Sequence, residues 1–144
     1  MRKFIPVLLI LTLLLACAQQ RESKTIPVPT KKIVLDGLNH PWSMAFLSPT
    51  QALISEKDGN LLKVDLETKK KSIIKGFPDD LTDSIRVVHF GDNSGIFEVL
   101  IDPNFTKTPW VYLSYAAKKR GAGTTTKVIR AQLKNDSLYG HETL

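Results

Sequence analysis

From Ile33 onward, the chain is a succession of short apolar-rich runs separated by turns that contain proline, glycine or aspartate. These runs lie at 33–35, 42–47, 52–56, 61–66, 96–101, 110–115 and 127–133, and a weaker one lies at 71–74. Runs this short, at this spacing, are typical of antiparallel strands. Beyond the first sixteen residues we find no stretch with the i, i+3, i+4 apolar spacing of an amphipathic helix. The sequence therefore predicts an all-β fold.

Two further patterns indicate how these strands are arranged. Asp58-Gly59 predicts a tight hairpin between the runs at 52–56 and 61–66, because both residue types tolerate positive φ. The order strand, proline-containing turn, strand, longer turn, strand occurs in 42–66 and again in 96–133. Repeated units of three to four strands predict the blades of a β-propeller. A β-sandwich whose halves are similar by coincidence is the alternative that the repeat leaves open.

The N-terminus has the features of an export signal. Arg2 and Lys3 precede an apolar run, Phe4 to Ala16, which is shorter than the roughly 20 residues of a membrane-spanning helix. Cys17 follows directly, and the four residues that end with it, Leu-Leu-Ala-Cys, resemble the bacterial lipobox. In that motif the leader is cleaved before the cysteine, which then carries acyl chains. We expect a signal peptide at 1–16 and lipidation at Cys17; an ordinary signal peptide with an incidental cysteine is the alternative.

The segment at 17–32 is expected to be a lipidated tether. It is polar after Cys17, contains two prolines and has no hydrophobic period, and about 15 extended residues reach roughly 50 Å. Ala18, rather than an aspartate, follows the cysteine; by resemblance to bacterial lipoproteins this favours the outer membrane, facing the periplasm. Because the chain has one cysteine, no disulfide can form within it. The folded part is predicted at 33–144.

Charge argues against a nucleic-acid partner. The 20 basic residues become 18 once Arg2 and Lys3 are removed, against 14 acidic ones, which leaves a mild formal charge of about +4. Two basic clusters occur at 69–71 and 118–120, and no aromatic residue is interleaved with either. Both are expected to be solvated loops, and we expect no binding to nucleic acid.

Several short sequence motifs carry a family resemblance. They are Pro-Trp-Ser-Met-Ala-Phe-Leu at 41–47, Ser-Glu-Lys-Asp-Gly at 55–59, Asp-Pro-Asn-Phe at 102–105, Val-Tyr-Leu-Ser-Tyr-Ala at 111–116 and the strand at 126–133. In this order and spacing, the chain resembles the N-terminal portion of the PQQ-dependent glucose/sorbosone (aldose sugar) dehydrogenases. The resemblance extends over about residues 33–134.

The resemblance implies a six-bladed β-propeller and an oxidoreductase that acts on CH–OH groups. In the family, pyrroloquinoline quinone (PQQ) and calcium lie at the mouth of the central channel. A histidine base removes a proton from an aldose sugar while hydride passes from its anomeric carbon to the quinone, which an electron acceptor later reoxidises. The binding residues for PQQ and calcium lie mostly outside the part of the family that this chain resembles.

The expected site residues are few. The family has a Gln-Gly-Gly-Leu-Leu-Asp segment, to which 93–98 corresponds, and Asn93 takes the place of the pocket glutamine with a side chain one methylene shorter. The family's catalytic His-x-Gly-Gly-Arg motif would lie beyond Leu144, so no catalytic residue is expected within the chain. His40, His89 and His141 do not match that motif and are expected to be surface or packing residues. No metal-binding spacing is present.

Length limits the number of blades. Cys17 to Leu144 is 128 residues, whereas even four blades need about 160. The chain therefore supplies about two blades. It is the start of a longer protein, a truncated gene product, or one subunit of an oligomer that completes the ring, and we expect one of the first two. The chain alone is expected to be inactive. An alternative function is a non-catalytic propeller lipoprotein that binds a sugar or a protein partner.

Overall fold

A computed structural model describes residues 29–82, 94–119 and 123–144. The chain divides into two compact units, Met1–Lys32 and Ile33–Leu144. Of the first unit, only residues 29–32 are described, and they have no regular secondary structure. The described part of the chain contains strands and turns and no helix at all, so none there could cross a membrane. The predicted all-β fold is confirmed.

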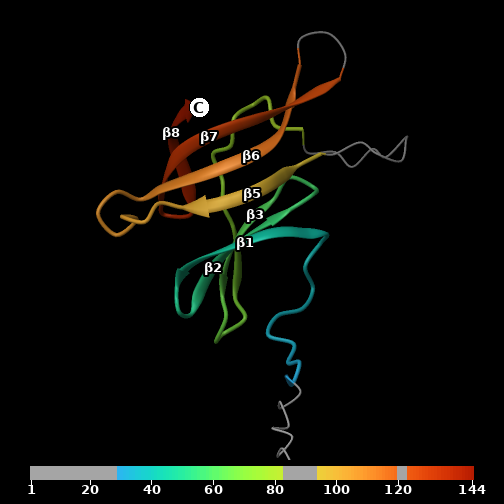
Figure 1. Cartoon of the computed structure of the whole chain (residues 1–144), viewed down its shortest axis with the longest axis vertical. Helices are drawn as coiled ribbons and strands as arrows, with labels where there is room; N and C mark the ends of the chain where they lie inside the picture. Colours follow the sequence, from blue (N-terminus) through green and yellow to red (C-terminus); the bar gives the residue numbers. More distant parts are fainter. Residues whose placement is uncertain (1–28, 83–93, 120–122) are drawn as a thin grey trace, which may run out of the picture. The chain divides into compact units, whose positions relative to one another are not determined.

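The first sheet has four antiparallel strands in the order β1 (Pro41–Ser48), β2 (Gln51–Glu56), β3 (Leu61–Asp65) and β4 (Lys71–Ile73) (Figure 1). The predicted hairpin joins β2 to β3, with Gly59 at a φ of 96°. Lys71 belongs to β4 and donates hydrogen bonds from its ammonium group to the carbonyls of Asp36 and Gly37, so this lysine is not part of a solvated loop.

The second sheet repeats this order with β5 (Ile96–Ile101), β6 (Trp110–Lys118), β7 (Thr124–Lys134) and β8 (Ser137–Thr143). The fourth strand, β8, was not predicted, because Leu138 is its one buried residue and the rest is polar or exposed. A signal for it was present: Asn135 and Asp136 form a two-residue turn with φ of 46° and 56°, between the paired residues Lys134 and Ser137.

The prediction of a strand at Ile33–Leu35 is wrong. These residues have no regular structure, because no neighbouring strand pairs with them within the described residues. Ile33 is 84% exposed and Val34 is 49% exposed. Leu35 alone of the three packs on the first sheet, against Ile54, Leu62 and Val64. Apolar content indicated a strand here, but a strand also needs a hydrogen-bonding partner.

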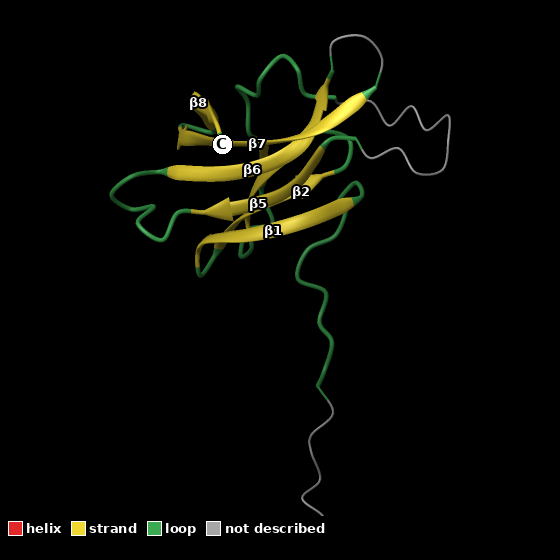
Figure 2. Cartoon of the chain, turned by 45° about the horizontal axis from the view of Figure 1, so that its top comes forward, coloured by secondary structure: helices red, strands yellow, loops and turns green. Residues whose placement is uncertain are grey.

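The main core lies between the two sheets, where β1 and β2 contact β5 (Figure 2). The first sheet contributes Leu53 and Leu61, and the second contributes Leu113 and Ile129, all at most 1% exposed. Full burial of each such side chain stabilises the fold by about 1.5–3 kcal/mol. An ion pair between Lys63 of β3 and Asp136 of the β7–β8 turn also joins the two sheets.

The two sheets are repeats in their hydrogen bonding as well as in their strand order. The backbone N–H of Ser43 in β1 donates to Ser55 Oγ in β2 at 3.0 Å. The backbone N–H of Glu98 in β5 donates to Ser114 Oγ in β6 at 3.1 Å. Each bond therefore joins the first strand of a sheet to a serine on its second strand. The same local structure is built twice, as the internal repeat in the sequence predicted.

Candidate functional site

The segment that carries Asn93 enters β5 through Ser94 and Gly95. Asn93 itself lies outside the described residues. Ser94 Oγ donates to the carbonyl of Lys57, in the β2–β3 turn, at 3.3 Å. Gly95 has a φ of 76°, and a Cβ at this position would lie 2.1 Å from the same carbonyl oxygen. Only glycine allows this contact between the sheets, so Gly95 brings the chain just before β5 against the β2–β3 turn.

The second sheet holds Gly95 from the other side. Its N–H donates to the carbonyl of Thr82 at 2.8 Å, and its carbonyl accepts the N–H of Ala116, in β6, at 3.0 Å. Ala116 in turn accepts the N–H of Thr82 at 2.9 Å. The backbone of Gly95 is thus hydrogen-bonded to β6 and to Thr82. Its neighbour Ser94 is bonded to the β2–β3 turn of the first sheet. We call residues 39–42, 56–60 and 94–97 the rim.

Two carboxylates stabilise the rim. Glu56 is only 4% exposed, and its carboxylate accepts the N–H of Asn39 at 2.7 Å and the side-chain amide of Asn60 at 3.3 Å. Asp58 accepts the Asn39 side-chain amide at 2.5 Å through Oδ2. Its Oδ1 is buried and has no partner among the described residues. Because Glu56 is satisfied by these internal bonds, we assign it a structural role.

An aromatic pair lies where the first strands of the two sheets begin. Trp42 of β1 and Phe97 of β5 have ring centroids 6.3 Å apart. The ammonium group of Lys57 lies 4.2 Å from the Trp42 ring centroid, within the range of a cation–π contact. Trp42 remains 51% exposed. The rim therefore presents an indole beside a positive charge, next to the segment that carries Asn93.

Glu98, the last residue of the 93–98 segment, links the first strands of the two sheets. Ser43 Oγ of β1 donates to the Glu98 carboxylate and accepts the N–H of Val99 at 3.3 Å. Sequence reasoning did not single out this pair. The available signal was a carboxylate in the otherwise apolar run Ile-Phe-Glu-Val-Leu-Ile. The pair fixes the spacing of β1 and β5 just below the rim.

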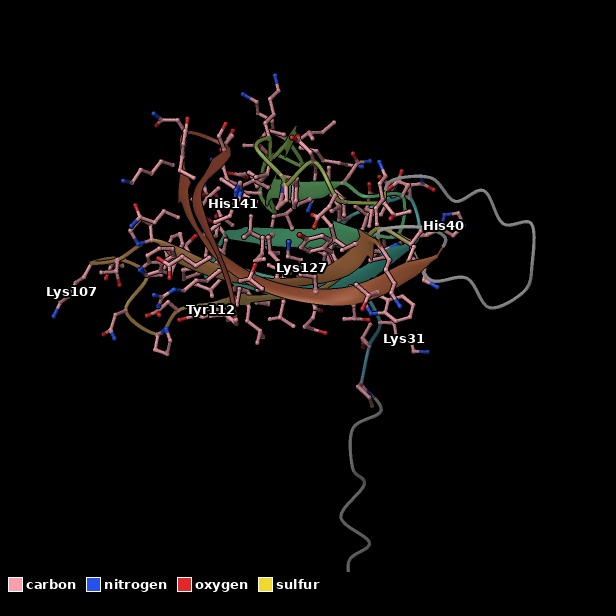
Figure 3. All side chains as sticks on the ribbon, turned by 90° about the horizontal axis from the view of Figure 1, so that it is seen from above. Lys31, His40, Lys107, Tyr112, Lys127 and His141 are labelled. Atoms are coloured by element: carbon pink, nitrogen blue, oxygen red, sulfur yellow. The ribbon has the colours of Figure 1, made fainter. Side chains whose placement is uncertain are left out.

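A charged cluster anchors the segment that runs toward 83–93. Tyr115 OH and Lys127 Nζ each donate to the Asp80 carboxylate at 2.8 Å (Figure 3 labels Lys127). The hydrogen bond from Lys127 holds the pKa of Asp80 below its usual value. Burial, followed by the nearby Asp80, raises the pKa of Tyr115. The phenol is therefore a neutral hydrogen-bond donor at physiological pH, and this cluster was also missed from sequence.

The two histidines that the structure describes lie apart from each other (Figure 3). His40 (φ 47°) adjoins β1, and its carbonyl accepts the N–H of Lys57 at 3.2 Å. His141 Nε2 is 2.6 Å from the carbonyl oxygen of Gly76, and Figure 3 shows the two labelled histidines well separated. His89 lies outside the described residues. Within residues 29–82, 94–119 and 123–144, no three His, Cys, Asp or Glu side chains are grouped to hold a metal ion.

Two four-stranded antiparallel sheets, each with the same order and packed through their first strands, define consecutive blades of a β-propeller. The family profile described as "Glucose / Sorbosone dehydrogenase" matches residues 38–144. This chain belongs to the glucose/sorbosone dehydrogenase family. The resemblance inferred from sequence is thus confirmed.

Individual relatives agree with this assignment. An uncharacterized protein of Synechocystis, slr1608, is 31% identical over 121 residues, which are 84% of this chain and 28% of that protein. A crystal structure of a glucose dehydrogenase is 33% identical, with a TM-score of 0.66, over 80% of this chain and 32% of its own. The soluble aldose sugar dehydrogenase of Escherichia coli, in its apo form, is 26% identical, with a TM-score of 0.64, over 78% and 31%.

A fourth relative shares the fold. The PQQ-bound aldose sugar dehydrogenase of Streptomyces coelicolor has a TM-score of 0.61 at 20% identity, over 78% of this chain and 31% of its own. The chain spans about a third of the length of each of these relatives.

Proposed function

We propose that this chain is the N-terminal part of a lipid-anchored quinoprotein dehydrogenase that oxidises aldose sugars at the anomeric carbon, with PQQ as the hydride acceptor. The observation that carries the proposal is the family match over residues 38–144. Likeness to solved sugar dehydrogenases at 33% and 26% identity supports it.

In this proposal, the chain's own contribution is to build one side of the pocket mouth. Asn93 supplies a side-chain amide to the sugar, in the position of the family's glutamine. Ser94 and Gly95, which follow Asn93, are held against the β2–β3 turn. The Ser43–Glu98 hydrogen bond joins β1 to β5. These bonds are internal to the protein, so they position the segment before a sugar binds.

The described residues do not by themselves form a site for PQQ and calcium. The two rim carboxylates, Glu56 and Asp58, are engaged with Asn39 and Asn60, and no metal-binding group of three occurs among the described residues. PQQ, when bound to the whole protein, would supply the two-electron acceptor. The proposal places the catalytic histidine and most cofactor ligands beyond Leu144, so we derive no catalytic step for this chain and expect it to be inactive alone.

The enzymatic proposal is tested with the whole gene product, supplied with PQQ and calcium. We expect oxidation of an aldose to its lactone, detected by product analysis, and we expect Asn93→Ala to raise the KM for the sugar more than it lowers kcat. A reconstituted, folded protein that oxidises no aldose would contradict the proposal. Equal kinetics of wild type and Asn93→Ala would remove Asn93 from the pocket while leaving the activity assignment in place.

We also propose that Cys17 carries the lipid and that the protein faces the periplasm from the outer membrane. The apolar leader, the Leu-Leu-Ala-Cys motif and Ala18 support this proposal. Stable anchoring requires more than one acyl chain, at about 0.8 kcal/mol per buried CH₂. Growth with a labelled fatty acid should label the wild type in the outer-membrane fraction, and Cys17→Ser should be unlabelled. Equal labelling of both proteins would contradict lipidation at Cys17.

A non-catalytic propeller lipoprotein is the second candidate, and the substitution of Asn93 for the family's glutamine favours it. The coding sequence after Leu144 distinguishes the two candidates. A His-x-Gly-Gly-Arg motif there supports the enzyme, whereas a continuing propeller without that motif supports a binding protein.

A further inference from the structure

A cleft lies between the two sheets, at the end of the strands opposite the rim. Leu47, Gln51 and Lys63 of the first sheet line one side, and residues of the β5–β6 loop and the β7–β8 turn line the other. Its volume is about 460 Å³, within the range of roughly 300–1,000 Å³ that is typical of small-molecule sites. Figure 3 shows Lys107, in the β5–β6 loop, at the opposite end of the sheets from His40 of the rim. Because the two described sheets supply both sides, no further blade is needed to form this cleft, which we call the junction cleft.

The floor of the junction cleft is apolar. Leu133 is 9% exposed and belongs to the main core, against which Leu47 and Phe105 also pack while they remain partly exposed. The N–H of Phe105 donates to the carbonyl of Asp102 at 2.9 Å, which closes a turn within the β5–β6 loop. The N–H of Leu133 donates to the carbonyl of Pro109 at 2.8 Å and ties that loop to β7. A phenyl ring is therefore held in place at the floor, where it offers a flat apolar surface to a ligand.

An ion pair lines the same cleft. Lys63 of β3 pairs with Asp136 of the β7–β8 turn, and their side chains are 32% and 35% exposed. The hydrogen bond from Lys63 lowers the pKa of Asp136, so both groups are charged at neutral pH and neutralise each other. The bond between them leaves further N–H donors on the ammonium group and further lone pairs on the carboxylate. The pair thus offers donors and acceptors to a ligand without a net charge.

The β7–β8 turn presents two polar side chains to the cleft at a conformational cost. Asn135 and Asp136 have φ of 46° and 56°, and glycine is preferred at the second position of such a turn. Asp136 instead keeps a carboxylate there, and Asn135 adds a side-chain amide to the lining. The N–H of Lys75 donates to the Asp136 carbonyl at 3.0 Å and fixes the turn. These polar groups are therefore positioned before any ligand binds.

A second hollow, of about 250 Å³, continues the junction cleft. The two hollows share Gln51, Lys63 and Asp136. The second hollow adds Asp65 and Lys70, together with two hydroxyl side chains. Its two lysines balance its two carboxylates, so this hollow has no formal net charge. A long, uncharged ligand with many polar groups fits such a surface better than an ion does.

We propose that the junction cleft binds a neutral saccharide of two or more units, with the apolar side of one ring on Phe105. In this pose, hydroxyls of the same ring hydrogen-bond to Asn135, Asp136 and Lys63. An entirely apolar ligand would desolvate the ion pair without replacing its hydrogen bonds with water, which is unfavourable. A saccharide has an apolar C–H side and hydroxyls that both donate and accept, so it matches the floor and the polar lining together. This binding is separate from aldose oxidation, because the cleft and the rim lie at opposite ends of the strands.

The test measures the binding of neutral disaccharides to the whole gene product, without PQQ, by titration calorimetry. The probes are the methyl glycosides of cellobiose, maltose, lactose and mannobiose. Because these compounds have no free anomeric hydroxyl, they cannot be substrates of the proposed oxidation. We expect saturable binding of at least one probe, at one site per chain.

Two substitutions in the junction cleft should each weaken that binding about tenfold, the effect of one lost hydrogen bond or one lost ring contact. Asn135→Gly removes the amide and suits the positive φ, and Phe105→Leu removes the ring but keeps an apolar side chain. Phe105→Tyr keeps the ring and should bind as the wild type does. The matched control, Asn104→Ala, removes an exposed amide from the same loop outside the lining and should also leave binding unchanged. Thermal unfolding establishes that each variant is folded.

Two results would overturn the proposal: a folded wild-type protein that binds none of the four probes, or binding that Asn135→Gly and Phe105→Leu leave unchanged. With PQQ and calcium supplied, Asn135→Gly should oxidise aldoses as the wild type does, and an equal loss of binding and oxidation would contradict the separation of the two sites. A whole protein that binds a probe but oxidises no aldose would refute the proposed function alone, so the two proposals fail separately.

Discussion

The two sheets share one plan but differ in size, and the difference shows where stability resides. In the first sheet β3 has five residues and β4 has three, whereas in the second sheet β6 has nine and β7 has eleven. Ten of the thirteen buried residues in the main core come from the strands of the second sheet, whereas the outer core of the first sheet has three buried residues. The second sheet therefore supplies most of the main core, and the rim draws on residues of both sheets.

The largest expected effect separates the two cores with one chemical change. Leu113→Ala, in the main core, should reduce the free energy of unfolding by about 3–4 kcal/mol, because Leu113 is fully enclosed and leaves a cavity. Leu62→Ala, in the outer core of the first sheet, should cost about 2 kcal/mol, since its surroundings can relax toward solvent. Urea unfolding measures both. Equal costs would show that the second sheet does not dominate stability.

The next effect tests the contact between the sheets at the rim. Gly95→Ala should reduce the free energy of unfolding by about 2–3 kcal/mol. The φ of this residue is strained for alanine, and the added Cβ would clash with the Lys57 carbonyl. Gly140→Ala is the matched control: it has a φ of 60° but no atom near the added Cβ, so it should cost about 1 kcal/mol. If thermal unfolding shows the same loss in both variants, the close approach has no energetic weight.

The Asp80 cluster should produce a smaller, pH-dependent effect. The pKa of Asp80 is lowered in the folded state by Lys127, so its contribution is present above the unfolded pKa of about 3.9 and is lost as pH falls through the folded value. Asp80→Asn should cost about 1 kcal/mol at neutral pH, reduced by partial solvent exposure. On acidification, the free energy of unfolding of the Asp80→Asn variant should also fall less than that of the wild type. Parallel pH profiles in urea unfolding would contradict this role.

The smallest effect is expected at the edge of the second sheet. Arg130 donates two hydrogen bonds to Glu142, at 2.8 and 2.6 Å, and also lies over the Trp110 ring. The Glu142 side chain is 49% exposed, so Glu142→Gln should leave the urea concentration at the midpoint of unfolding almost unchanged. A loss as large as that of Asp80→Asn would mean that edge charges stabilise this sheet as strongly as partly buried ones.

Local patterns were sufficient to predict most strands. The short apolar runs of β2 and β6 and the Asp58-Gly59 turn follow from side-chain burial and backbone conformation, which the sequence records directly. The failures had non-local causes. Ile33–Leu35 has strand-forming residues but no partner within the described residues, and β8 pairs with β7 although its own composition is largely polar.

The candidate site was less predictable than the fold. Family resemblance pointed to the segment that begins at Asn93, but the residues that hold its neighbour Gly95 come from distant parts of the chain. Gly95 lies against the carbonyl of Lys57, in the other sheet. Asp80, farther along the chain, accepts hydrogen bonds from Tyr115 and Lys127. No spacing in the sequence records such contacts. The available signal was the glycine at position 95, because a glycine can mark a place where another backbone approaches too closely for a side chain.

The central claim is that these two sheets begin a sugar dehydrogenase. It is tested most directly by assaying the whole gene product and the 144-residue chain side by side, with PQQ, calcium, an aldose and an artificial electron acceptor. The account predicts aldose-dependent reduction of the acceptor by the whole protein and none by the chain. A whole protein that is folded and binds PQQ yet gives no aldose-dependent reduction, or a short chain that turns over sugar, would contradict it.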